Sequence, residues 1–142
     1  MKISTWLAII VIAAGLDGPV AAPPVEAQAF EPDLLDVKFR EGAKVRLRDD
    51  RPVELSNQDA VRLDLQGLQS AFAGGTWSRT HSADERVLDS LRTKRQANSA
   101  KPLPDLNNYF RLRLPHGLAA TNAKKIIERY PSVEGAYLRL FW

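Results

Sequence analysis

The side chains that most often carry out catalysis are few in this chain, and their spacing does not gather them into one site. Cysteine is absent, which excludes thiol nucleophiles, disulfide frameworks and cysteine-ligated metals. The two histidines, His81 and His116, fall beside turn-forming residues. We interpret both as solvated loop histidines rather than as the base of a Ser-His-Asp triad.

Two pairs of adjacent carboxylates have simpler explanations than acid–base catalysis. Asp49 and Asp50 lie in a predicted turn, a position that suits short acidic side chains. Asp84 and Glu85 begin a predicted helix, where negative charge complements the helix dipole. No glycine-rich phosphate loop follows a strand, and no G-x-S-x-G sequence is present. We therefore expect no enzyme, no cofactor and no bound metal.

The first residues are typical of an export signal. Lys2 precedes an uncharged apolar stretch at residues 6–16, which is too short to span a bilayer. The A-x-A pattern at residues 27–29 predicts cleavage after it, and residues 20–22 offer a second candidate; an uncleaved membrane anchor is the alternative. We expect a signal peptide at 1–29, a mature domain at 30–142, secretion or a periplasmic location, and no membrane contact after cleavage.

The composition is that of one small globular domain. Hydrophobic residues make up 44% and charged residues 26% of the 142 residues, which excludes disordered, collagen-like and polytopic membrane classes. The formal net charge of +3 is too small to indicate a nucleic-acid partner by itself. Without disulfides, we expect a monomer with a free energy of unfolding of about 5 kcal/mol.

Hydrophobic periodicity predicts four core strands and two core helices. Alternating apolar residues indicate strands at 35–40, 76–80, 106–114 and 133–142, and a hairpin at 44–55 follows the first of them. An apolar face at Val61, Leu65, Leu68 and Phe72 predicts a helix that begins with a capping box at 56–59. Ala123, Ile126, Ile127 and Tyr130 predict the second core helix.

An additional helix is predicted between the second and third core strands. It begins with a capping box at residues 82–85, and we expect it to dock on the core only through its first two turns. Without this helix, the order is β-α-β-β-α-β, which predicts an α+β, ferredoxin-like fold with an antiparallel sheet. Both core helices would cover one sheet face and leave the other face open.

The open sheet face is the candidate binding surface. Strand alternation predicts that it carries these partner-binding side chains: Lys38, Arg40, Tyr109, Arg111, Arg113, Tyr137 and Arg139. Tyrosine and arginine are the residue types that most often anchor protein interfaces.

Three stretches together resemble a known family. They are residues 37–42 (VKFREG), 104–112 (PDLNNYFRL) and 130–137 (YPSVEGAY). Their order is similar to that in the N-terminal propeptides of secreted bacterial subtilisin-like serine peptidases, over about residues 35–137. The resemblance implies an inhibitor and folding chaperone that docks its open sheet face on surface helices of the peptidase domain. It also implies a free-standing inhibitor or a truncated product, because no catalytic domain follows the last strand.

A different binding module on the same fold is the alternative interpretation. Its ligand on the open face would be another protein or a nucleic acid, because aromatic and basic side chains on a four-stranded sheet can stack bases. The predicted export and the absence of a K/R-G-F/Y-type strand signature argue against nucleic acid. We therefore expect a peptidase domain as partner and no nucleic acid.

Overall fold

The computed structural model describes residues 29–141. The predicted signal peptide therefore lies outside the described residues except for Ala29, and so does Trp142. In chain order the elements are β1 (Phe30–Phe39), β2 (Val45–Arg48), β3 (Arg51–Glu54), α1 (Asp59–Ala71), β4 (Thr76–Arg79), α2 (Glu85–Gln96), the 3-10 helix η1 (Leu106–Asn108), β5 (Tyr109–Arg113), α3 (Ala120–Ile127) and β6 (Val133–Leu140).

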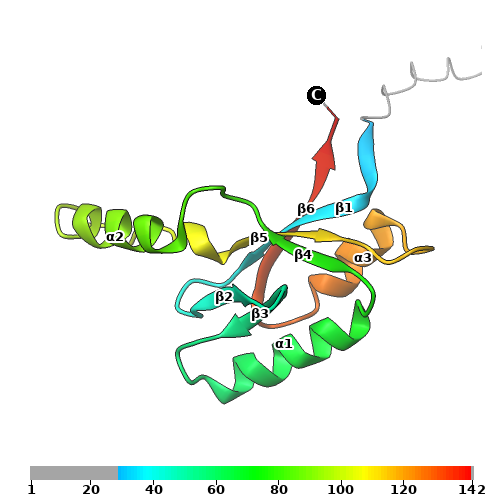
Figure 1. Ribbon diagram of the computed structural model, residues 1–142, viewed down its shortest axis with the longest axis horizontal. Helices are drawn as coiled ribbons and strands as arrows, with labels where there is room; N and C mark the ends of the chain where they lie inside the picture. Colours follow the sequence, from blue (N-terminus) through cyan, green and yellow to red (C-terminus); the bar gives the residue numbers. More distant parts are fainter. Residues whose placement is uncertain (1–28, 142) are drawn as a thin grey trace, which may run out of the picture.

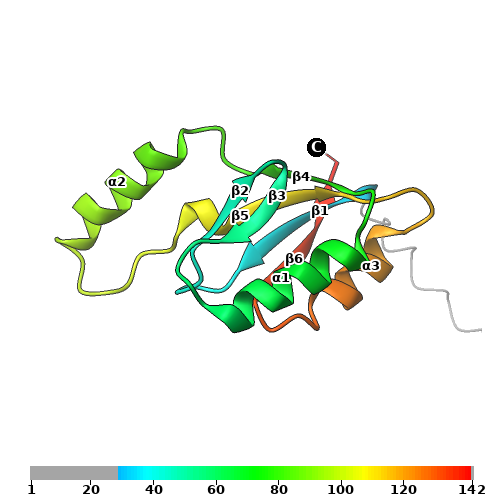
Figure 2. The same ribbon diagram turned by 60° about the horizontal axis from the view of Figure 1, so that its bottom comes forward.

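Four strands form the central antiparallel sheet, in the order β4-β5-β1-β6. After the β2–β3 hairpin, α1 lies between β1 and β4 in the chain, and α3 lies between β5 and β6. Without the hairpin and α2, this order is the predicted β-α-β-β-α-β plan. Figure 2 shows α1 and α3 on the same side of the sheet, with no helix on the opposite side. The predicted α+β, ferredoxin-like architecture with one open sheet face is therefore confirmed.

The core lies between the sheet and the two helices. Leu35, Val37 and Phe39 of β1 are buried, and the β5 neighbours of Leu35 and Val37 are also apolar. Leu65, Leu68 and Phe72 from the α1 segment complete this layer, as the helical periodicity predicted. The strand phase read from the sequence is thus correct, because one buried face fixes which alternate residues point inward.

The start of each long helix differs from the prediction. Ser56 does not cap α1; its hydroxyl donates to Glu54, and the helix begins after Gln58 without a side-chain cap. The N-cap of α2 is Asp84, whose carboxylate accepts from the backbone N–H of Arg86. Both predicted capping boxes are therefore wrong, because nearby polar groups compete for the same backbone donors.

Two strand boundaries also differ from the prediction. β1 begins at Phe30 rather than at residue 35. The predicted strand at 106–114 starts with η1, because the Asp105 side chain accepts from the backbone N–H of Asn107 and turns the chain there. β5 proper begins at Tyr109.

The β2–β3 hairpin forms a separate two-stranded sheet beside α1. Its two-residue turn places Asp49 and Asp50 at φ of 49° and 59°, the left-handed region that aspartate tolerates in tight hairpin turns. Val45 is buried and joins the core of the main sheet. The hairpin therefore lengthens the core beyond the end of β1.

The α2 helix projects away from the sheet and from both core helices (Figures 1 and 2). We call α2 and the segment that returns to β5, residues 85–106, the arm. The helix has no buried residue, and Val87 and Leu91 are 51% and 42% exposed. The predicted docking of its apolar stripe on the core is therefore wrong, although the first two turns do contact the body. Polar side chains, described below, attach the arm instead.

Candidate binding surface

Strand register brings most of the predicted site residues together on the open face of the sheet. Asp36 of β1 lies opposite Arg111 of β5 and opposite Tyr137 of β6. One pair further along, Lys38 lies opposite Tyr109 and opposite Gly135. Arg113 and Arg139 continue the same alternation on β5 and β6.

Arg40 is the exception among the predicted residues. It follows the last residue of β1, and its Nε donates a hydrogen bond to the carbonyl oxygen of Pro131. It lines a hollow that Val61 and Asp64 of α1 also line. The assignment of Arg40 to the open face is therefore wrong, because the strand alternation ends one residue before it.

Every other predicted cation on the open face has a carboxylate partner. The ion pairs are Arg111–Asp36 at 3.1 Å, Arg113–Asp33 at 2.6 Å, Lys38–Glu134 at 2.6 Å and Arg139–Glu31 at 3.2 Å. The hydrogen bond to Glu134 raises the pKa of Lys38 above its ordinary value. The surface is thus a set of paired charges rather than a group of free cations.

Three of the four acidic partners were missed in the sequence for a physical reason. Asp36 shares the alternation of Lys38, so its place on this face was readable. Glu31 and Asp33 lie in the part of β1 that was not predicted as strand. Glu134 is the extra residue of a β-bulge, where the pairing shifts from Lys38–Gly135 to Phe39–Val133. A period of two cannot reveal a bulge, so nothing in the local pattern assigned Glu134 to this face.

Two tyrosines are the aromatic groups of the open face. Tyr137 is 55% exposed, and its hydroxyl would lie only 2.7 Å from a Cβ atom placed on Gly135. The absence of a side chain at Gly135 therefore lets the ring lie along β6. Tyr109 is half-buried between the Lys38 ammonium, 5.4 Å from its ring centre, and the His81 ring, 5.7 Å away. His81 thus packs on the sheet, whereas His116 is exposed.

A second polar cluster lies inside the molecule, where the arm meets the hairpin. Arg46 of β2 is only 2% exposed, and one guanidinium nitrogen contacts Asp89 at 2.9 Å and Asp105 at 3.0 Å. Its buried Nε forms no hydrogen bond and lies 3.7 Å from Glu85. Asn108, fully buried, accepts from the backbone N–H of Val45 and donates to the backbone of the β1–β2 turn.

This buried cluster attaches the arm to the body of the molecule. It joins β2, α2 and η1 through a single guanidinium whose donors face carboxylates and an amide. The Arg48 guanidinium, at the rim, donates two hydrogen bonds to Glu85 and holds the pKa of that carboxyl below its ordinary value. Residues 104–112, one of the three stretches that resemble the propeptide family, therefore help to attach the arm through Asp105 and Asn108.

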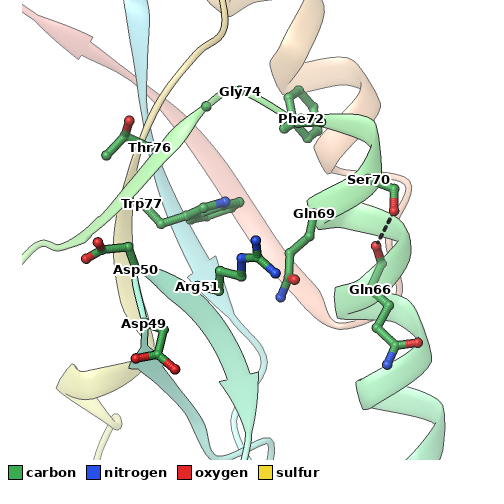
Figure 3. Close-up of a pocket in the computed structure, with 12 residues that line it drawn as sticks. Asp49, Asp50, Arg51, Gln66, Gln69, Ser70, Phe72, Gly74, Thr76 and Trp77 are labelled. Atoms are coloured by element: carbon green, nitrogen blue, oxygen red, sulfur yellow. Dashed lines mark hydrogen bonds between the residues drawn. The ribbon is translucent and has the colours of Figure 1, made fainter.

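A cavity of about 650 Å³ separates the hairpin turn from the C-terminal end of α1 and from β4. Figure 3 shows Arg51 and Gln69 extending toward one another across it, with the Trp77 ring above them in this view. No histidine lines this cavity. Among residues 29–141, no cluster of three or more histidine, cysteine or carboxylate side chains is placed to hold a metal ion.

Compared with known proteins, the chain matches no protein-family model, no curated protein and no solved structure. Within the described part of the chain, none of the helices has both the length and the apolar character needed to cross a membrane. The open face, with its paired charges and exposed tyrosine, is the feature from which a function can be argued.

Proposed function

We propose that this chain binds the catalytic domain of a subtilisin-like serine peptidase through the open face of its sheet, as an inhibitor, as a folding chaperone, or as both. In this proposal the chain performs no chemistry itself. A generic binding module on the same fold is the second candidate.

The observation that carries the proposal is where the three resembling stretches meet. They are separated by long intervals in the sequence, yet their strands are neighbours in the sheet. Lys38 from the first stretch lies opposite Tyr109 from the second and opposite Gly135 from the third. The motifs therefore share one surface, and a common binding role would account for their presence on adjacent strands.

The chemistry of that surface suits a folded protein partner. Tyr137 offers a large, rigid aromatic group at little cost in conformational entropy. The ion pairs around it can accept hydrogen bonds and donate them, so a partner can complete the network without leaving a buried charge unpaired. A domain that binds the folded peptidase stabilises that state by mass action. Refolding becomes faster where the same contacts already form in the folding transition state of the peptidase.

The same charges weaken the nucleic-acid alternative. Sequence-independent binding to phosphates requires lysine and arginine side chains that are free to replace counterions. On the open face, Arg111, Arg113 and Lys38 already contact carboxylates. The observed charge arrangement thus favours a protein partner.

The test is inhibition and refolding of a subtilisin-like peptidase by the purified chain. We expect slower initial hydrolysis of a chromogenic peptide, faster recovery of activity from denatured peptidase, or both. Tyr137→Ser is expected to weaken the effect about 10-fold or more, as for an aromatic anchor at an interface. The matched control is Leu63→Ser, because Leu63 is 66% exposed on α1.

The control must behave like the unchanged chain, and circular dichroism must show both variants folded. Equal loss in the two variants would remove the open face as the docking surface. If the chain at micromolar concentration neither inhibits the peptidase nor speeds its refolding, the peptidase proposal itself is overturned.

A further inference from the structure

The arm carries an apolar groove that the proposed function does not use. Leu88 and Leu91 of α2 line one side, and Leu103, Pro104 and Leu106 of the return segment line the other, around about 150 Å³. A cavity of this size accommodates a benzene-sized apolar group. Leu91 and Leu106 remain 42% and 39% exposed, so the walls of the groove are accessible to a partner.

The groove is preformed rather than a gap between loose segments. The carbonyl oxygen of Leu103 accepts from Arg92 Nε at 3.1 Å, and its N–H donates to Gln96 Oε1 at 2.7 Å. Both partners lie on the last turns of α2. The return segment is therefore fixed against the helix, which lowers the entropy lost when a ligand binds.

The charges around the groove indicate the character of its occupant. Arg95 lines the groove, and Lys94 and Lys101 lie on the same end of the arm. Between residues 29 and 141, no carboxylate lies within ion-pair distance of these three side chains. The carboxylates of α2 that face the body, Glu85 and Asp89, are already paired with arginines. The outer end of the arm is thus uniformly positive.

We propose that the arm is a docking site for an acidic segment of a partner protein, which inserts one apolar side chain between Leu91 and Leu106. The unpaired cations attract the acidic flanks and raise the association rate. The groove supplies the desolvated pocket in which an aromatic or leucine side chain gains binding free energy. This inference is independent of the proposed function, because the arm and the open face share no residue.

The test uses fluorescein-labelled peptides and the purified chain, with binding followed by fluorescence anisotropy. The probe is a short peptide of aspartate and glutamate residues around one central phenylalanine. Two matched peptides replace the phenylalanine by serine or all acidic residues by lysine. We expect the first peptide to bind, its affinity to fall with added salt, and both matched peptides to bind at least about 5-fold more weakly.

Variants locate the binding site on the arm. Leu91→Ser and Arg95→Glu are each expected to weaken binding of the phenylalanine peptide about 5-fold or more. Leu63→Ser on α1 and Lys125→Glu on α3 are the controls, because they make the same leucine-to-serine change and an equivalent charge reversal at exposed positions away from the arm. They are expected to leave affinity within about 2-fold.

Three outcomes overturn the inference. They are that the phenylalanine peptide does not bind, that the serine peptide binds equally well, or that the arm variants bind the peptide as tightly as the unchanged chain does. Binding to phosphatidylserine vesicles is measured in a separate experiment. Binding to them with the same dependence on Leu91 and Arg95, and without peptide binding, would assign the arm to a lipid surface instead.

Discussion

The open sheet face and the arm carry similar residue types but organise their charges in opposite ways. On the face, Arg111 and Lys38 each contact a carboxylate from a neighbouring strand. On the arm, Lys94 and Arg95 have no such partner among residues 29–141, while Leu91 stays half-exposed. The face is therefore close to neutral and ordered by its own pairs, whereas the outer arm is positive and incomplete.

The difference follows from how each region is attached to the molecule. A central strand brings side chains from both neighbours within reach, so opposite charges can pair at every second residue. The arm contacts the body along one line of α2, through Glu85, Asp89 and Arg92, and at Asp105 of the return segment. Its outer end projects away from the sheet (Figure 1). Among the described residues, Lys94 and Arg95 at this end have no ion-pair partner. An exposed surface of this kind is more informative about binding than residue composition alone.

The largest expected effect comes from detaching the arm at its buried arginine. Arg46→Ala leaves Asp105, 4% exposed, and Asp89 without their shared cation. Removing one partner of a buried ion cluster costs about 3–5 kcal/mol. We expect that loss in urea unfolding, measured by circular dichroism. The control Arg48→Ala removes a guanidinium that is 47% exposed and should cost no more than about 1 kcal/mol. Equal losses of unfolding free energy in the two variants would show that the burial of Arg46 adds nothing to its contribution.

Lowering the pH should destabilise the attachment of the arm, by less than Arg46→Ala does. The hydrogen bonds from Arg48 lower the pKa of Glu85, and Arg46 and Arg79 add to the effect. A lowered pKa means that this carboxylate stabilises the fold above its unfolded pKa of about 4.3, and that the contribution is lost as the pH falls through the folded value. We expect hydrogen-exchange protection factors of α2 amides to fall below about pH 4, relative to those of β1.

Arg48→Ala provides the control for this acid dependence. The variant lacks the largest cause of the lowered pKa, so the loss of α2 protection on acidification should shrink. An unchanged pH profile in the variant would assign the loosening to other carboxylates of the arm.

The contrast between the two regions also shows what the sequence could predict. Alternation at Leu35, Val37 and Phe39 was enough for the strand phase, and through it for the fold and most of the open face. These features depend on hydrophobic periodicity and burial, which can be read from neighbouring residues in the sequence. The predicted face omitted Glu134 and wrongly included Arg40, because a bulge and a strand end change side-chain direction without changing residue type.

The arm was mispredicted for a related reason. Its stripe of apolar residues favoured docking on the core, yet Arg46 attaches it through carboxylates 43 and 59 positions away in the chain. Contacts of that sequence separation leave no periodic trace. The two alternating arginines of the strand, Arg46 and Arg48, were readable. Nothing in the sequence showed which one is buried or what its partners are.

The smallest expected effect on stability, and the sharpest test of the comparison, comes from making the face resemble the arm. Asp36→Asn, Asp33→Asn and Glu134→Gln together remove the nearest carboxylates of Arg111, Arg113 and Lys38, and leave Glu41 at 3.5 Å from the Lys38 ammonium. Each surface pair contributes about 0–1 kcal/mol, so the triple variant should stay folded in urea unfolding. The unmasked cations should nevertheless lengthen retention on heparin in a salt-dependent manner. Replacing Asp59, which pairs with Arg62 on α1, by asparagine is the single-site control. Unchanged retention would mean that carboxylate pairing does not set the binding character of the open face.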